Sequence, residues 1–267
     1  MTQLTANNIS PQPINWFKNG ALPTPLSEQE EWSTEEKNHL ALLAQADLLF
    51  LIAQLFAPPS AKLQTLLKIE VPDITELLYS SNLPEQKNIA ETYQEIRQQA
   101  QSLNLDTWIA EYNHLFEGNV RCPINESGFI RRDKGAILAD IAGFYNAFGF
   151  KLSEDASEKV DHLTAELEFM AMLLVKLVQA PDKEETARTT HDALGSFSFD
   201  HLGEWLPTFC EKLTKTSTLI LYHELAKLLL SAWTGILKIN QLPLPEAEIQ
   251  NPSQDDSTPY ECGMVEQ

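Results

Sequence analysis

The sequence predicts an all-α protein. Apolar residues recur at helical spacing along most of its 267 residues, and 43% of the chain is hydrophobic. No segment combines strict apolar–polar alternation with the β-branched enrichment typical of strands, so no strand is expected. Prolines, glycines and capping residues divide the pattern into pieces of helix length. We therefore expect a single compact helical bundle.

Local signals place the helices in order. Ser33 followed by Glu36 is a capping box that opens the first long helix, and Pro58-Pro59 closes it. Pro84 suits the first turn of a later helix, and Asp106 is expected to cap the next one. The helices expected after the first span residues 61–68, 73–79, 84–103, 106–116, 136–150, 158–180, 183–194, 201–213 and 216–238.

Composition divides the chain into three parts. Residues 1–30 lack sustained periodicity and are expected to form a flexible N-terminal arm. Residues 31–242 form the helical domain, with a polar joint at 151–160 that could act as a hinge. Residues 243–267 are rich in Pro, Ser and Asp and are expected to be a disordered acidic tail.

The charge balance excludes some classes of partner. The chain carries 38 acidic and 19 basic side chains, a net charge of −19. Nucleic acid and anionic membranes bind through Lys and Arg, so neither is an expected partner. The tail from Leu244 onward holds six of the acids and no base, which leaves −13 for the rest of the chain. A cationic partner would be attracted.

Localisation is expected to be cytoplasmic. The N-terminus lacks the basic and apolar regions of a signal peptide. The most apolar run, Leu40–Phe56, is short for a membrane span and is interrupted by polar residues, so we expect a core helix and no stable membrane insertion. Three scattered cysteines without a CxxC pair fit a reducing compartment.

Signatures of catalysis are largely missing. The sequence contains no phosphate loop, no dinucleotide-binding glycine pattern, no GxSxG and no HExxH. Two ExxH pairs, Glu36–His39 and Glu111–His114, have the spacing that ferritin-like di-metal bundles use. Glu36 also suits the first turn of a helix without any metal. We expect no metal, no cofactor and no catalytic residue, and we keep a helical di-metal oxidoreductase as an alternative.

The stretch from Glu111 to Met170 is the most informative part of the chain. Tyr112, Leu115 and Phe116 share a helix face, as core residues or as a binding surface. The connector 117–134 lacks helical period, and long connectors in helical domains are usually functional or disordered. His162 and Glu166 are one turn apart and could bridge. Cys122 is expected to be a partly buried hydrophobic residue.

At these residues the chain resembles the TorD/DmsD/NarJ-type chaperones, also called redox-enzyme maturation proteins. The resemblance covers about Leu40–Leu237 and is sharpest at Tyr112-x-x-Leu115-Phe116-x-Gly118, at Pro123–Ser127 and at Asp161-His162-x-x-x-Glu166-Leu167-x-Phe169-Met170. Cys122-Pro123 followed by Ala139–Gly149 looks most like the subgroup that serves type II dimethyl-sulfoxide-reductase-family enzymes. One departure is Val160, where the family commonly has Pro before Asp-His.

The resemblance implies a non-catalytic, all-helical, cytosolic chaperone. Members bind the catalytic subunit of a molybdopterin oxidoreductase, often through its twin-arginine signal peptide, and hold it for cofactor insertion before export. Such a protein would be a monomer or a helix-swapped dimer. The residues expected to contact the peptide or the client are Tyr112, Leu115, Phe116, Glu117, Pro123, Glu126, Ser127, Phe129, Asp161 and His162.

Physical reasoning from the residues leads to the same kind of site. A twin-arginine leader is basic and then apolar, so its receptor should offer an apolar groove edged by carboxylates. Tyr112, Leu115, Phe116 and Phe129 could form that groove. The acids expected at its edge are Glu117, Glu126 and Asp161. A generic helical adaptor remains the third alternative beside the chaperone and the di-metal enzyme.

Overall fold

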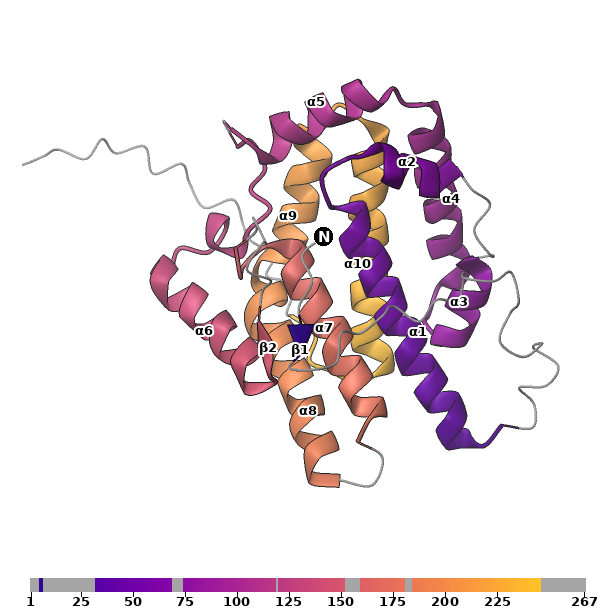
Figure 1. Cartoon of the computed structure of the whole chain (residues 1–267), viewed down its shortest axis with the longest axis vertical. Helices are drawn as coiled ribbons and strands as arrows, with labels where there is room; N and C mark the ends of the chain where they lie inside the picture. The colour runs from indigo at the N-terminus through magenta and orange to yellow at the C-terminus, as the bar shows by residue number, and fades with distance from the viewer. Residues whose placement is uncertain are drawn as a thin grey trace, which may run out of the picture.

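The computed structural model describes residues 32–68, 74–118, 120–151, 159–180 and 184–245, together with the backbone of Thr5 and Ala6. Within these ranges the protein is an α-helical bundle, which confirms the predicted fold class (Figure 1). Three long helices form its centre: α1 (Thr34–Leu55), α7 (Leu163–Val178) and α10 (Ile220–Ile239). Helix α1 packs along α7 and also contacts α10. Helix α7 is buried over most of its length because apolar residues occur on all its faces.

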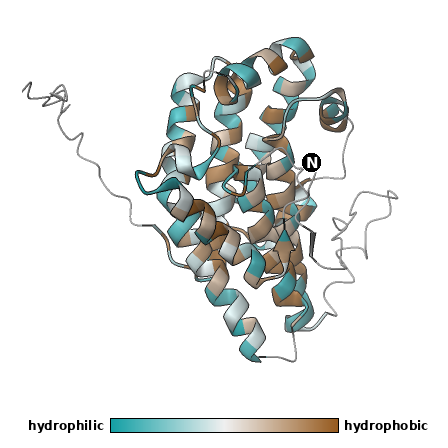
Figure 2. Ribbon diagram, turned by 60° about the vertical axis from the view of Figure 1, so that its left-hand side comes forward, coloured by the Kyte–Doolittle hydropathy of each residue, from teal (hydrophilic) through white to brown (hydrophobic). Residues whose placement is uncertain are grey.

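Shorter helices surround this centre. Helix α4 (Gln86–Ser102) packs on α10, and α3 (Ile74–Ser81) packs between α4 and α1. Helices α2 (Ala61–Lys68) and α5 (Leu105–Phe116) lie at the top of the view in Figure 1, and α6 (Lys134–Ala147) lies at its left edge. Helix α8 (Glu184–Phe197) packs on α7, and α9 (Gly203–Thr216) packs on α10. Figure 2 shows hydrophobic residues running through the middle of the bundle.

The start of α1 confirms a local prediction. The Glu36 backbone N–H donates to Ser33 Oγ over 3.2 Å, and the Ser33 backbone N–H donates to Glu36 Oε2 over 2.8 Å. This reciprocal pair is a complete capping box. Two later starts were predicted wrongly. Helix α4 begins at Gln86, after Glu85 in the left-handed region (φ 58°), so Pro84 lies outside it. The cap of α5 is Asn104, whose side chain accepts from the N–H of Asp106.

Helices α7 and α10 also begin later than predicted. Helix α7 starts at Leu163 rather than near residue 158. The Asp161 side chain is hydrogen-bonded to the connector, and the His162 side chain caps the first turn of α7. Helix α10 starts at Ile220 rather than 216. The preceding turn is held by Glu111, whose carboxylate accepts from Ser217 Oγ (2.8 Å) and from the Thr218 N–H (2.6 Å).

Helices α8 and α9 are joined without a break. The predicted gap at 195–200 is instead the end of α8 followed by a π-helical turn, Ser198–Leu202, which leads directly into α9. A π-helical turn inserts an extra residue per turn and is frequent at functional sites. Here it carries the buried residues Ser198 and His201.

The expectation of no strands was wrong at one place. Phe150–Lys151 (β2) pairs antiparallel with Thr5–Ala6 (β1) after Gly149, which has φ +74° and ends α6. Two residues are too few to show alternation, so the pattern could not reveal this pair. The rest of the predicted arm 1–30 and most of the predicted hinge 151–160 lie outside the described residues. Of the predicted tail 243–267 only 243–245 are described, and Pro243 and Pro245 approach Gly195 and Gly203.

Among the described helices, α1 alone is long and apolar enough to cross a membrane. Half of its apolar window is buried inside the protein. Core helices of soluble proteins meet the same criterion, and α1 packs against α7, α3 and α10. The expectation that Leu40–Phe56 belongs to a core helix agrees with this packing.

Candidate functional site

The connector between α5 and α6 is fastened to the start of α7. Asn125 and His162 form an antiparallel backbone bridge. On either side of it, the Leu163 N–H donates to Ile124 O and the Glu126 N–H donates to Asp161 O, each with a nitrogen–oxygen distance of 3.0 Å. Segments that are more than thirty residues apart in the chain therefore form one rigid junction.

Asp161 completes this junction with its side chain. Its Oδ1 accepts a hydrogen bond from Asn125 Nδ2 and its Oδ2 accepts one from the Ser127 N–H, each with a nitrogen–oxygen distance of 3.1 Å. The carboxylate is fully buried, so these donors replace the water that it loses. His162 caps α7, because its Nδ1 accepts from the Thr164 N–H over 3.3 Å. Asp161 thus anchors the connector, whereas His162 caps the start of α7.

A buried polar cluster lies beneath the junction; it consists of Glu126, Glu166, His201 and Trp205. His201, from the π-helical turn, places Nδ1 3.0 Å from Glu126 Oε2. Trp205, from α9, donates from Nε1 to Glu166 Oε2 over 3.2 Å. All four side chains are almost fully buried. Elements from both halves of the chain meet here through polar contacts that have defined geometry.

Two atoms of this cluster have no hydrogen-bond partner: Glu166 Oε1 and His201 Nε2. Burial, followed by the nearby Glu126 carboxylate, raises the pKa of Glu166 well above its usual value, although the Trp205 hydrogen bond acts in the opposite direction. The neutral form of Glu166 is therefore favoured. His201 Nε2 lies 3.7 Å from Oδ2 of Asp140, which is 65% exposed on α6, so the cluster reaches toward the surface.

The edge of the cluster nearest solvent is formed by Arg132. Its Nη2 lies 2.8 Å from Glu204 Oε2 and 3.7 Å from the buried Glu126 Oε1. The guanidinium is half exposed and links a surface acid with an acid in the core. The connector thus contributes a basic residue that pairs with two acids.

The ten predicted contact residues fall into two groups. Six are buried: Tyr112, Leu115, Phe116, Glu126, Asp161 and His162. Four are exposed or partly exposed: Glu117, Pro123, Ser127 and Phe129. The expectation that Tyr112, Leu115 and Phe116 line an open groove is corrected in this structure. Phe116 packs its ring 5.0 Å from Tyr112 and 5.7 Å from Tyr222, within the core. A direct contact between these three residues and a peptide stays a prediction.

Glu126 and Asp161 were expected at the edge of one groove. The structure does bring them together, but as buried hydrogen-bonding residues rather than an exposed rim. The sequence signal was their motif, and motif spacing carries no information about depth. His201, Trp205 and Arg132 were missed because each reaches the cluster through long-range contacts that no local pattern indicates.

Three partly exposed residues of the connector, Pro123, Ser127 and Phe129, are together called the loop surface. The Phe129 ring lies 5.6 Å from Trp205 and 6.1 Å from Phe209, and Lys212 Nζ lies 5.7 Å from its centre. Gly128 lets Pro123 approach closely, since a Cβ on Gly128 would be 2.4 Å from Pro123 Cβ. The loop surface is therefore held rigidly by the core below it.

The described residues offer little for covalent or metal chemistry. Burial raises the pKa of the Cys122 and Cys210 thiols to about 12 each, so neither supplies a thiolate at neutral pH. Within the described ranges, no three His, Cys, Asp or Glu side chains are placed to share a metal ion. Glu111, from one of the ExxH pairs, is occupied in holding the turn before α10.

Comparison with known proteins assigns this part of the chain. The model of the family described as nitrate reductase delta subunit matches residues 83–211. Residues 83–211 are thus similar to that family over a little less than half of the chain. This segment contains the junction, the buried cluster and all ten predicted contact residues. The resemblance to redox-enzyme maturation proteins is thereby confirmed.

Two curated relatives are similar over the same length. A chlorate reductase assembly chaperone protein from Ideonella dechloratans is 35% identical over 121 residues, 44% of this chain and 63% of that protein. A selenate reductase assembly chaperone protein from Thauera selenatis is 36% identical over 122 residues, again 44% and 63%. The chain thus matches less than two thirds of each. A solved structure, described as a candidate redox enzyme maturation protein from Archaeoglobus fulgidus, covers 83% of this chain and 99% of its own at 18% identity and a TM-score of 0.42.

Proposed function

We propose that this protein is a non-catalytic chaperone for the catalytic subunit of a molybdopterin oxidoreductase. It holds the subunit in the cytoplasm for cofactor insertion and assembly before export. The observation that carries the proposal is the family match over residues 83–211, together with relatives that are assembly chaperones for chlorate and selenate reductases.

The finer part of the proposal is that the chaperone binds the twin-arginine signal peptide of its client. The net charge of −19 favours encounter with a basic leader. The loop surface offers an apolar contact, and the exposed acids Asp140 and Glu204 border the buried cluster next to it. Because the loop surface is fixed by the core, a peptide would meet a preorganised contact.

The test is binding of a synthetic peptide that carries a twin-arginine motif followed by an apolar segment, measured by isothermal titration calorimetry. We expect Phe129→Ala to raise Kd by about tenfold, because it removes the largest apolar side chain of the loop surface. Tyr79→Ala is the matched control, since Tyr79 is also an exposed aromatic residue (58%) but lies on α3. Equal affinity of Phe129→Ala and the wild type would refute a role for the loop surface.

The client itself is tested in cells. The tagged chain should co-purify with a molybdenum-enzyme catalytic subunit, identified by mass spectrometry, in the cofactor-free form. Recovery of no such subunit from cells that produce the reductase would refute the proposed function. The expected oligomeric state is a monomer or a helix-swapped dimer, and size-exclusion chromatography with light scattering would distinguish the two.

A further inference from the structure

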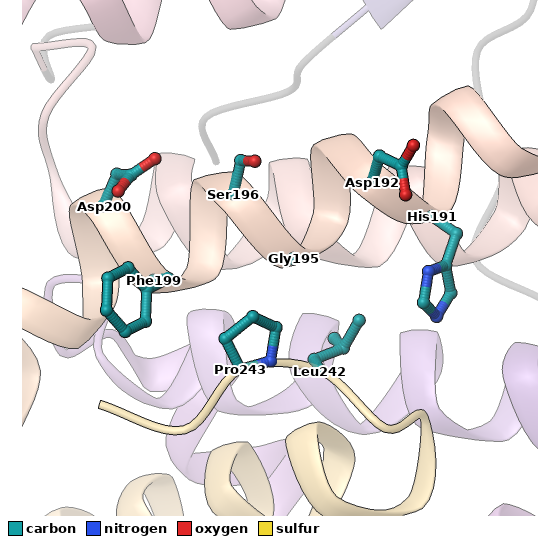
Figure 3. Close-up of a pocket in the computed structure, with 8 residues that line it drawn as sticks. All are labelled: His191, Asp192, Gly195, Ser196, Phe199, Asp200, Leu242 and Pro243. Atoms are coloured by element: carbon teal, nitrogen blue, oxygen red, sulfur yellow. The ribbon is translucent and has the colours of Figure 1, made fainter. Parts of the chain in front are cut away.

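A recess lies beside the end of α8. It is formed between the end of α8, the π-helical turn and the segment that follows α10 (Figure 3). Its volume is about 560 Å³, within the range of ligand-binding pockets. Gly195 lies close to the segment after α10, since an added Cβ there would be in ordinary van der Waals contact with Pro243 Cδ, at 3.4 Å. We call this recess the α8 groove; it is lined by His191, Asp192, Gly195, Ser196, Phe199, Asp200, Leu242 and Pro243.

One side of the α8 groove is acidic. Figure 3 shows Asp192, Ser196 and Asp200 on the same side of the continuous α8–π helix. Among the described residues neither aspartate has an ion pair within 4.0 Å, and no Lys or Arg lines the groove. Eight residues of helix correspond to about 12 Å, so the two carboxylates are separated by about that distance. Unpaired acids at this spacing are complementary to two cations.

The other side of the groove is apolar. Phe199 points toward the segment that contains Leu242 and Pro243, and it is 42% exposed. The wall is held in place, because His191 Nε2 lies 3.0 Å from the carbonyl oxygen of Asn240 in the same segment. An exposed aromatic ring beside a fixed proline offers a contact for aliphatic side chains. The groove thus combines an apolar wall with two acids.

We propose that the α8 groove binds an extended segment of the client polypeptide that carries two cationic side chains three or four residues apart with aliphatic residues between them. An extended chain rises about 3.3 Å per residue, so this spacing matches the separation of Asp192 and Asp200. The inference rests on the proposed function only in taking the client as the source of the segment. The chain's own residues 246–267 are a poor occupant, because they contain six acids and no base.

The groove is tested with the full chain and a fluorescent peptide, Arg-Leu-Ala-Leu-Arg, by fluorescence anisotropy. A peptide of the same composition with adjacent arginines controls for spacing. We expect the spaced peptide to bind at least tenfold more tightly. We also expect at least tenfold weaker binding by Asp192→Asn/Asp200→Asn and by Phe199→Ser. Glu91→Gln/Asp106→Asn removes the same charge from α4 and α5 and should bind as the wild type does.

Several results would overturn the inference. These are no measurable binding by the wild type, equal binding of both peptides, or loss of affinity in the control double variant as large as in Asp192→Asn/Asp200→Asn. Displacement of the probe by a synthetic peptide of residues 246–267 would assign the groove to the chain's own tail. Dimerisation that Phe199→Ser abolishes would assign it to a second copy.

A final comparison separates the two proposals. The Asp192→Asn/Asp200→Asn variant should retain less client subunit in the co-purification than the control double variant does. Equal retention by both would refute the α8 groove as a client site while leaving the proposed function intact. Failure of the wild type to retain the reductase subunit would refute the proposed function, and the peptide measurement would still report whether the groove has the stated chemistry.

Discussion

Glu126 and His201 are 75 residues apart in the chain, yet the Oε2 of one lies 3.0 Å from the Nδ1 of the other in the buried cluster. The contact ties the connector between α5 and α6 to the π-helical turn between α8 and α9. Both side chains are at most 1% exposed, so each depends on the other to offset the cost of burial. Both residues lie within the segment 83–211 that matches the family model.

Breaking this pair should therefore be costly. We expect Glu126→Ala and His201→Ala each to lower the free energy of unfolding by about 3 kcal/mol, because each leaves a buried polar partner unsatisfied. The double variant should lose at least about 1 kcal/mol less than the sum of the two. Urea denaturation followed by circular dichroism measures all three. Glu204→Ala, at the exposed end of the Arg132 interaction, should cost less than about 1 kcal/mol. Strict additivity would show that the two residues do not couple.

The Asp161 carboxylate should control the order of the connector. Asp161→Ala removes the acceptor of the Ser127 N–H and of Asn125 Nδ2. We expect a loss of about 2 to 4 kcal/mol, with faster amide exchange over residues 124–128 by mass spectrometry. Asp161→Asn keeps one carbonyl acceptor and should show a smaller effect. Unchanged exchange at Ser127 in Asp161→Ala would argue against this anchor.

The close contact of Gly128 with Pro123 gives a third test. A Cβ on Gly128 would lie 2.4 Å from Pro123 Cβ and 2.9 Å from its Cγ, so Gly128→Ala should lower stability by about 2 kcal/mol. The same change in a Pro123→Gly background should cost much less, because the clashing atoms are gone. Gly143→Ala is the matched control: nothing lies within 4 Å of its added Cβ, and α6 should gain up to about 1 kcal/mol. Thermal unfolding ranks the four variants.

Local signals predicted local structure well. The capping box at Ser33 depends on residues three apart, and it forms as expected. The cap of α5 was misplaced because Asn104 and Asp106 are both good caps, and only the fold decides between them. Helix α7 was predicted to begin too early for a similar reason. Asp161 is a residue type common in the first turn of a helix, but its carboxylate instead accepts a hydrogen bond from the Ser127 N–H of the connector.

The sequence predicted which segments meet at the candidate site, but not how deeply their side chains are buried. The motifs identified the connector and the start of α7, which the structure joins. They could not indicate that Tyr112 and Phe116 face the core, since a helix face with aromatic residues has the same spacing whether it is buried or exposed. His201 and the α8 groove depend on a π-helical turn and on the segment after α10, which no periodic pattern signals.

Asp47, in the middle of α1, should make stability depend on pH. Burial raises the pKa of its carboxyl from 3.8 to about 7 in the folded protein. The folded state therefore holds a proton that the unfolded state has released at any pH between about 4 and 7. Across this window the contribution of Asp47 to stability falls as the pH rises, by at most about 1.4 kcal/mol per pH unit. Below the window the contribution is fully present.

Asp47→Asn removes this titration while keeping a side chain of the same shape. We expect the free energy of unfolding of the variant, relative to the wild type, to increase as the pH is raised from 4 to 7 and to level off above 7. Chemical denaturation at each pH measures the difference, and taking the difference cancels groups that titrate in both proteins. A flat difference for Asp47→Asn would mean that α1 accommodates the charged carboxylate at no cost, which contradicts the burial seen for this helix.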